Sequence, residues 1–217
     1  MGMIIDDCAT GKPECPPGFK MFKRPLGRQW CMKVFPGNLT WWEAERECRC
    51  RVKGATLSGV ESSAEMRWLE EQGQQVLDKE HVSNGGIWIG AYRRKDCQGV
   101  KSTWESKAAC KPGKMFQYTD KHTCSKLMFE QHWADGKPSS EIVNGEQENC
   151  GIFLVSTESG QTQSGKVGNK LCSQVTSTPS IYSSKGFVCG IEPHVGTGYG
   201  GGGGGMVVIG SGKPAGK

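Results

Sequence analysis

The chain has 217 residues, a hydrophobic content of 35% and a formal net charge of +5. This length is enough for one domain with a substantial core plus tails. The longest apolar run near the end, residues 206–209, is far below the ~20 residues of a membrane-spanning helix, so we expect no membrane span. The pI of about 8.6 falls short of the clustered basic charge typical of nucleic-acid binding, so we expect no nucleic-acid partner.

Eleven cysteines indicate a disulfide-bonded protein from an oxidising compartment. The only close pair, Cys48 and Cys50, is too tight for the usual two-residue spacing of zinc ligands. We therefore expect a secreted or lumenal protein. The first seven residues lack the apolar core of a signal peptide, so we expect a mature or truncated form, or a missing upstream exon.

Two apolar runs around a Pro-Leu-Gly turn at 25–27 predict a hairpin at the start of the domain. The runs cover residues 19–22 and 30–35, and Cys15 and Cys31 are placed to staple them.

Two capping boxes predict two helices, over 40–53 and over 62–79. The apolar face of the first helix is formed by Trp41, Ala44, Cys48 and Val52. Its charged residues alternate in sign, which favours a solvated face over an anion site. In the second helix Gly73 is unfavourable by about 1 kcal/mol relative to alanine.

The run Ile87-Trp88-Ile89 lies between glycines and predicts a central strand covered on both faces. Residues 93–186 are expected to be mostly loop, with further strands at 151–155 and 186–189. A loop region this long is typical of functional segments, and its five cysteines predict that it is stapled. After Pro193 the glycine-rich end has no preceding strand or following helix, which favours a flexible tail over a phosphate-binding loop.

The order of these pieces resembles the C-type lectin-like domain over about residues 15–192. The residues that carry the resemblance are Cys15-Pro16-Pro17-Gly18-Phe19, Cys31, Cys48, Trp88-Ile89-Gly90, Glu148-Asn149-Cys150, Cys172 and Phe187-Val188-Cys189. It implies an α+β fold in which two helices pack on short antiparallel strands and a long disulfide-stapled loop region carries the binding surface. We expect an N-terminal tail at 1–14, the domain at 15–193 and a Gly-rich tail at 194–217.

The resemblance also implies a disulfide pattern. The implied pairs are Cys15–Cys31, Cys48–Cys189 and Cys150–Cys172, with Cys97–Cys110 as an added loop staple that looks like a variant common in nematode members. Three cysteines remain, and an odd total leaves at least one without an internal partner. We expect Cys8–Cys50, with Cys124 free or joining two chains in a dimer.

Candidate ligand-binding side chains lie in the loop region. The tryptophans Trp41 and Trp88 are expected in the core, whereas Trp104 and Trp133 remain candidates for stacking on sugar rings. A zinc site from His122, Cys124 and His132 lacks a fourth ligand, so surface histidines are the better interpretation. No Gly-x-Ser-x-Gly motif is present, so we expect no enzyme. Asn38 begins the only N-glycosylation sequon.

In sugar-binding members of the resembled family, oxygen-bearing residues flank a loop proline and bind calcium. Here Lys137 and Ser139 flank that proline, and Glu148 and Asn169 remain from the ligand set. An ammonium group is a donor without an acceptor and repels a cation. We therefore expect no metal, no other cofactor, and ligand binding that survives chelation.

We expect carbohydrate recognition without the usual calcium site, at a host–microbe or cuticle surface, or alternatively calcium-independent recognition of an extracellular protein. A shifted register could bring Glu141 or Glu146 into a calcium site. An ice- or mineral-binding role has no support, since no repetitive threonine or acidic array is present.

Overall fold

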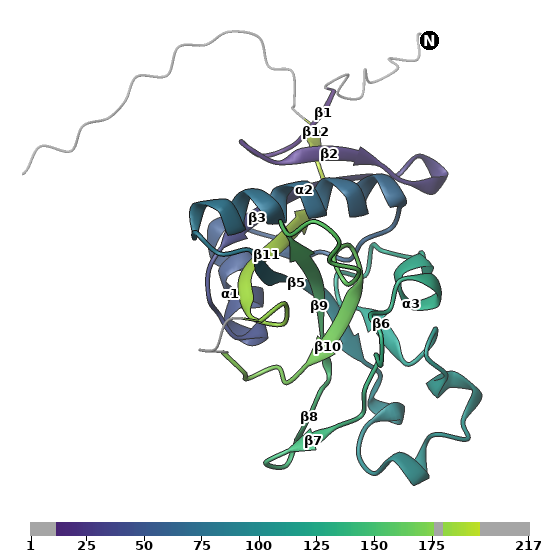
Figure 1. Ribbon diagram of the computed structural model, residues 1–217. Helices are drawn as coiled ribbons and strands as arrows, with labels where there is room; N and C mark the ends of the chain where they lie inside the picture. The colour runs from purple at the N-terminus through teal and green to yellow at the C-terminus, as the bar shows by residue number, and fades with distance from the viewer. Residues whose placement is uncertain (1–11, 176–179, 196–217) are drawn as a thin grey trace, which may run out of the picture.

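The computed structural model describes residues 12–175 and 180–195 (Figure 1). The helices are α1 (Trp41–Arg51), α2 (Ser63–Lys79) and α3 (Leu127–Gln131). The strands are β1 (Pro13–Glu14), β2 (Lys20–Lys23), β3 (Gln29–Pro36), β4 (Thr56–Leu57), β5 (Asn84–Arg93), β6 (Phe116–Tyr118), β7 (Ile142–Val143), β8 (Glu146–Gln147), β9 (Cys150–Ser156), β10 (Val167–Lys170), β11 (Ser184–Ile191) and β12 (His194–Val195).

The main sheet places β5 near its centre, in the order β10-β9-β5-β11-β3-β2, with β4 against β11 and β6 against β5. The pair β5 and β11 is parallel, and the other neighbouring pairs are antiparallel. Ile87, Trp88 and Ile89 in β5 have no exposed surface. The prediction of a central strand covered on both faces is therefore confirmed.

Each face of the sheet has its own hydrophobic cluster. Alternate residues of β5 and β9 point to opposite faces, as the period of a strand requires. Ile87 and Phe153 pack in the cluster under α2, whereas Trp88 and Ile152 pack in the cluster under α1. Figure 1 shows α2 running across the top of the sheet, with the β1 and β12 ribbon beyond it.

The two predicted helices are confirmed, but only the first has the full capping box. The Thr40 hydroxyl accepts from the Glu43 amide, and the Glu43 carboxylate accepts from the Thr40 amide. In α2 the Ser62 hydroxyl accepts from the Glu65 amide, yet the Glu65 carboxylate binds Arg24 instead of the cap. The buried guanidinium is the stronger partner for a carboxylate.

Two glycines allow close backbone packing around the sheet. A Cβ on Gly73 would lie 2.7 Å from Val155 Cγ2, so the glycine lets α2 approach β9. A Cβ on Gly90 would lie 2.2 Å from the Leu57 carbonyl oxygen. The low helix propensity of Gly73 is thus offset by tertiary packing.

The region expected to be mostly loop contains more regular structure than its sequence indicates. The predicted strands at 151–155 and 186–189 are present as β9 and β11. Strand β10, the short helix α3 and the β7–β8 hairpin were not predicted. These elements are short and lack a clear period, so their pairing partners, and not their own sequence, determine them.

Four disulfides join Cys15–Cys31, Cys48–Cys189, Cys97–Cys110 and Cys150–Cys172, the pairs that the resemblance implies. Within the described residues, Cys50 and Cys124 are exposed and form no disulfide. Cys8 lies outside the described residues, as do most of the two expected tails. Where those tails meet the domain, β1 pairs with β12. No helix in the described ranges is long and apolar enough to span a bilayer.

Candidate ligand-binding site in the long loops

The long loops leave the sheet after β5 and return to it at β9, at the lower end of the molecule in Figure 1. Two segments form the candidate site. We call residues 94–115 the staple loop, since Cys97–Cys110 closes it, and residues 136–141 the Pro138 loop. The β7–β8 hairpin follows the Pro138 loop.

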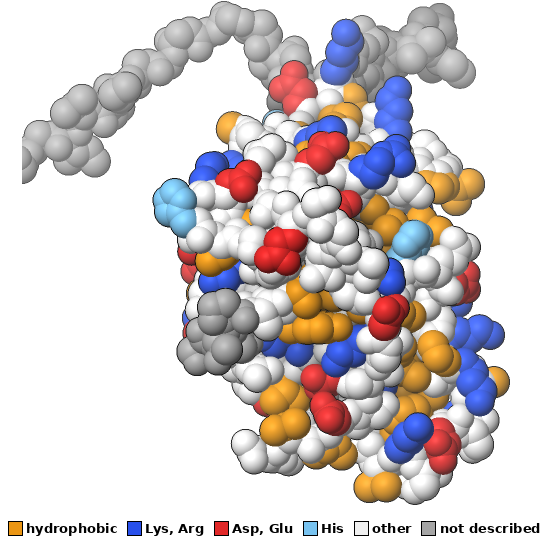
Figure 2. All heavy atoms as spheres, viewed as in Figure 1, with side chains coloured by type: hydrophobic (Ala, Val, Ile, Leu, Met, Phe, Trp, Pro, Cys, Tyr) orange, Lys and Arg blue, Asp and Glu red, His pale blue; other side chains and the backbone are white. Residues whose placement is uncertain are grey.

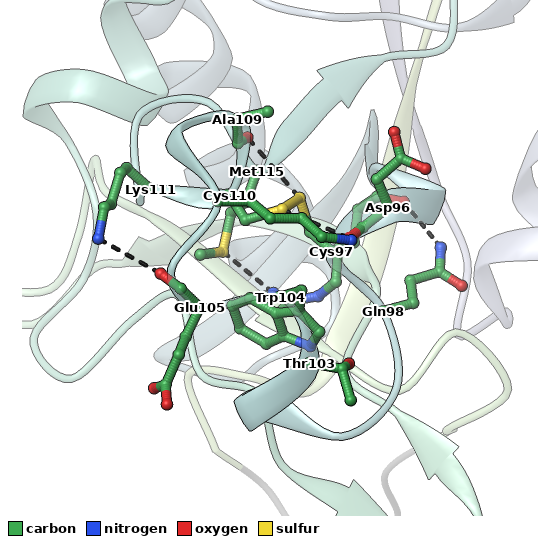
Figure 3. Close-up of a disulfide and its surroundings, with 12 residues drawn as sticks. Asp96, Cys97, Gln98, Thr103, Trp104, Glu105, Ala109, Cys110, Lys111 and Met115 are labelled. Carbon is green, nitrogen blue, oxygen red and sulfur yellow. Dashed lines mark hydrogen bonds between the residues drawn. A yellow bond between two sulfur atoms is a disulfide. The ribbon is translucent and has the colours of Figure 1, made fainter.

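The staple loop is built around Trp104, which is only 2% exposed. Its indole nitrogen donates to the Gly99 carbonyl at 3.1 Å. Figure 3 shows the ring lying inside the loop beside the disulfide, with Glu105 and Lys111 to one side. The sequence left Trp104 as a candidate for stacking on sugar rings, but the structure buries its ring inside the staple loop.

Trp133, the second stacking candidate, is half-buried against other aromatic rings. Its ring centroid lies 5.7 Å from that of Phe129 and 5.1 Å from that of Phe116. Aromatic pairs at these separations stabilise a core beyond their buried area. The ring therefore supports the loop region from beneath.

The other four predicted residues, Lys137, Ser139, Glu148 and Asn169, come together. Lys137 Nζ lies 2.7 Å from Glu148 Oε2, and both side chains are largely buried. The Ser139 hydroxyl donates to the same carboxylate oxygen. A lysine ammonium thus occupies the acceptor that a bound cation would use.

Asn169 holds the Pro138 loop to the sheet. Its side chain is fully buried on β10, and its Oδ1 accepts from the Ser139 amide at 2.9 Å. Its Nδ2 donates to the carbonyls of Ser139 at 3.0 Å and Glu148 at 2.6 Å. One amide side chain therefore fixes both sides of the site, and all of its hydrogen-bonding groups are used.

Arg93, at the end of β5, was missed by the sequence reasoning. Its side chain has no exposed surface, and its Nη2 donates to the carbonyls of Ser139 and of Glu148. Burial lowers the pKa of the guanidinium to about 10, while the Glu148 charge opposes that shift. An arginine directly after a buried strand was the available signal, but such residues usually extend into solvent.

Lys170 is the third cation near Glu148. Only 2% of it is exposed, and its Nζ donates to the Tyr182 carbonyl at 2.8 Å. Burial lowers its pKa to about 8; Glu148 acts to raise it and Lys137 to lower it further. The electrostatic environment of Glu148 is therefore dominated by positive charge.

An open groove of about 670 Å³ runs between the staple loop and the Pro138 loop. Its lining includes Lys101, Trp104, Glu105, Lys111, Met115, Pro138, Ser139, Ser140 and Glu141. Gln147 in β8 exchanges hydrogen bonds with Gly99, which ties the hairpin to the staple loop. Figure 2 shows hydrophobic side chains at the surface of this lower end, among lysine, arginine and acidic side chains.

A sheet covered on both faces by helices, a long stapled loop region and this disulfide set define a C-type lectin-like domain. The chain belongs to the C-type lectin domain-containing protein 141/158 family, whose model matches residues 24–192. The resemblance found in the sequence is confirmed.

Individual relatives were found by sequence and by structure. The chain is 24% identical over 170 residues to C-type lectin domain-containing protein 158 of Caenorhabditis elegans, covering 75% of this chain and 79% of the relative. It is 34% identical over 93 residues to one chain of the snaclec coagulation factor IX/factor X-binding protein of Gloydius halys, covering 42% and 55%. The herring type II antifreeze protein structure aligns with a TM-score of 0.49 and 19% identity, over 82% of this chain and 98% of that chain.

Lys137, Ser139, Glu148 and Asn169, at the position where the resemblance implies a calcium site in sugar-binding members, do not fit the ion. Calcium needs six to eight oxygen ligands. Here the Glu148 carboxylate already binds Lys137 and Ser139, and the Asn169 carbonyl oxygen is bonded to the Ser139 amide. Among residues 12–175 and 180–195, no three or more His, Cys, Asp and Glu side chains gather where they could hold a metal.

Proposed function

We propose that the protein is a secreted, non-enzymatic C-type lectin-like module that binds an extracellular protein through the long-loop groove without calcium. The observation that carries the calcium independence is the 2.7 Å ion pair between Lys137 and Glu148. Secretion is supported by the four disulfides, which persist in oxidising compartments.

The ion pair replaces the metal in this proposal. Lys137 and Glu148 are 14% and 13% exposed, so solvent screens their attraction only weakly. A calcium ion would have to displace the ammonium and then sit close to Lys137, Arg93 and Lys170. Like charges at such separations are strongly unfavourable in a partly buried site.

A protein ligand fits the groove better than a sugar does. The Trp104 ring is buried and the Trp133 ring is packed against Phe129, so neither offers an open face for a pyranose ring. The nearby exposed apolar residues are Val100, Ile142 and Val143. Apolar contacts inside a rim of mixed charge are typical of protein interfaces. One relative is itself named for binding coagulation factors IX and X.

The proposal is tested by screening the purified protein against an array of extracellular protein domains and a glycan array. Each is run with about 2 mM calcium and with excess chelator. We expect a saturable protein ligand whose affinity is unchanged by chelation and reduced by Glu105→Ala and Lys111→Ala, while Arg67→Ala on α2 has no effect.

Two outcomes would contradict the proposal. Binding that disappears with chelator, or a micromolar calcium site abolished by Glu148→Ala in isothermal titration, would restore the metal. A glycan ligand that depends on the residues of the long-loop groove would favour carbohydrate recognition, which the resemblance first implied, over protein recognition.

The unpaired cysteines and the sequon complete the proposal. We propose that Cys8 pairs with Cys50, and that Cys124 either stays free or joins two chains. Peptide mapping of the non-reduced protein tests this, and a Cys124–Cys50 link would contradict it.

Asn38 is exposed directly before α1, and we propose that it carries a glycan.

A further inference from the structure

A second groove, on the α1 face of the domain, has the composition of a ligand site. It has a volume of about 560 Å³ and shares no lining residue with the long-loop groove. Trp42, Arg46 and Arg49 line it from one helix face, at positions i, i+4 and i+7. Thr56 and Thr119, which lie outside α1, also line it.

Trp42 presents an aromatic surface that is already fixed in place. It is 53% exposed, while its ring contacts Trp41 edge-on at 4.9 Å and Tyr92 at 5.7 Å between centroids. Trp41 is in turn fixed by its indole nitrogen, which donates to the Ile89 carbonyl at 2.9 Å. A ring held by its neighbours loses little conformational entropy when a ligand packs on it.

Arg46 supplies positive charge to the groove. This charge acts on the Glu43 carboxylate, whose pKa is lowered chiefly by hydrogen bonds from Thr40 and also by Arg46. Arg49 is paired with Glu45 at 2.6 Å, and that carboxylate also accepts from Thr56 and from the Leu57 amide. Arg46 forms no ion pair within the described part of the chain. Its neighbour Glu43 is engaged in the helix cap by Thr40. The groove therefore favours an anion beside the tryptophan.

We propose that this groove binds an acidic saccharide, with one pyranose ring packed on Trp42 and its carboxylate or sulfate held by Arg46. The C–H face of a pyranose is apolar and packs on an indole ring, while a guanidinium matches an oxyanion bidentately. Thr119 also lines the groove, and its buried hydroxyl has no hydrogen-bond partner among the described residues. The site is independent of the long-loop groove and of the protein ligand proposed there.

Isothermal titration with three tetrasaccharides tests the proposal. The probes are a hyaluronan tetrasaccharide, which carries carboxylates, a heparin tetrasaccharide, which carries sulfates, and neutral chitotetraose. We expect an acidic probe to bind about tenfold more tightly than chitotetraose, and the preferred acidic probe identifies the oxyanion. Trp42→Ala is expected to weaken that binding about tenfold and Arg46→Gln about fivefold, with chelator having no effect.

The matched control is Lys53→Gln, which removes one positive charge just beyond α1 and outside the groove. It is expected to change binding less than about twofold, because its charge acts only at long range. Equal losses in Lys53→Gln and Arg46→Gln would show general electrostatic adhesion and overturn the proposal. Unchanged binding in Trp42→Ala, or no saturable binding below about 5 mM, would overturn it as well. Arg46→Gln alters an exposed side chain and keeps the test valid if Trp42→Ala fails to fold.

Discussion

The sheet half and the long-loop half of this domain differ in how much buried polar contacts add to apolar packing. In the sheet half, β5 and β9 are buried on both faces, and apolar clusters under α1 and α2 supply most of the contacts. In the loop half, buried Trp104 and Met115 also belong to the cluster under α2, but a disulfide, a buried arginine and a buried amide make the connections between the loop segments.

This difference determines how each half of the domain responds to substitution. Apolar burial is tolerant, since residues of similar volume can replace one another with modest loss of stability. Polar networks are intolerant, because a single lost partner leaves buried groups unsatisfied. We therefore expect the loop half to be more sensitive to loss of Arg93 or Asn169 than the sheet half is to loss of one apolar residue.

The largest expected effect on stability comes from removing one disulfide in each half. Cys48–Cys189 closes 141 residues across the sheet half, whereas Cys97–Cys110 closes 13 within the staple loop. Replacing each pair with alanine should lower the free energy of unfolding by about 5 and about 3 kcal/mol respectively in the chain-entropy model. Urea unfolding followed by circular dichroism measures both, with Cys124→Ser as the neutral control, since it removes no disulfide within the chain. Full reduction should unfold the domain, and near-native melting after reduction would contradict the comparison.

Asn169→Ala provides a sharper test, since it acts on the loop half alone. The substitution leaves the Ser139 amide and the carbonyls of Ser139 and Glu148 short of partners, so we expect a loss of about 2–3 kcal/mol. Hydrogen exchange should show lost protection over residues 138–150 with protection in α2 retained. The control is Asn84→Ala, which removes a half-buried amide at the end of β5 opposite to Arg93. It should change the free energy of unfolding by less than about 1 kcal/mol. A uniform loss of protection would show that the two halves unfold as one.

The sheet half could be predicted from the sequence because its signals are local and periodic. Thr40 and Ser62 began the two helices, and the run from Ile87 to Ile89 identified the central strand. In the sequence Gly73 appeared unfavourable for a helix. Only the fold shows that β9 approaches the helix at this position. A local pattern reports on the segment that carries it, and not on its neighbours in space.

The loop half could be predicted only where a family pattern marked its residues. Lys137, Ser139, Glu148 and Asn169 were placed at one site by the resemblance, and they do lie together. Arg93 carried no such mark, and its contacts with Ser139 and Glu148 span 46 and 55 residues. The ring of Trp104 was expected to be available, but burial of an aromatic side chain inside a stapled loop depends on packing that sequence spacing does not show.

A double-mutant cycle on Lys137 and Glu148 tests whether the site is an ion pair in energetic terms. Lys137→Met leaves the carboxylate with one hydroxyl partner, so we expect a loss of about 1–2 kcal/mol. Adding Glu148→Gln should recover about 1 kcal/mol of that loss, because it removes the carboxylate that has lost its ammonium partner. Thermal unfolding of the four proteins gives the coupling energy. Strictly additive effects would mean that the two charges do not interact.

The smallest effect concerns pH and the buried Lys170. Its pKa is lowered from 10.5 to about 8 in the folded protein by burial. Between those two values the unfolded chain binds more protons than the folded chain, so the free energy of unfolding rises with pH. From pH 8 to pH 9 this group alone should add about 1 kcal/mol, and below pH 8 its contribution to the slope should disappear.

Lys170→Met isolates that slope, since the variant retains the neighbouring charges of Glu148 and Lys137. From pH 8 to pH 9 the free energy of unfolding of the wild-type protein should rise by about 1 kcal/mol relative to that of the variant. Burial raises the pKa of Tyr118. Its contribution to the pH dependence of stability begins only above its ordinary pKa of 10.0, so it does not affect the comparison between pH 8 and pH 9. Urea unfolding with every free thiol blocked avoids thiol exchange at alkaline pH. Parallel pH profiles for the two proteins would instead show that the Lys170 ammonium is in contact with water. The edge of the loop half that β10 supports would then be hydrated as well.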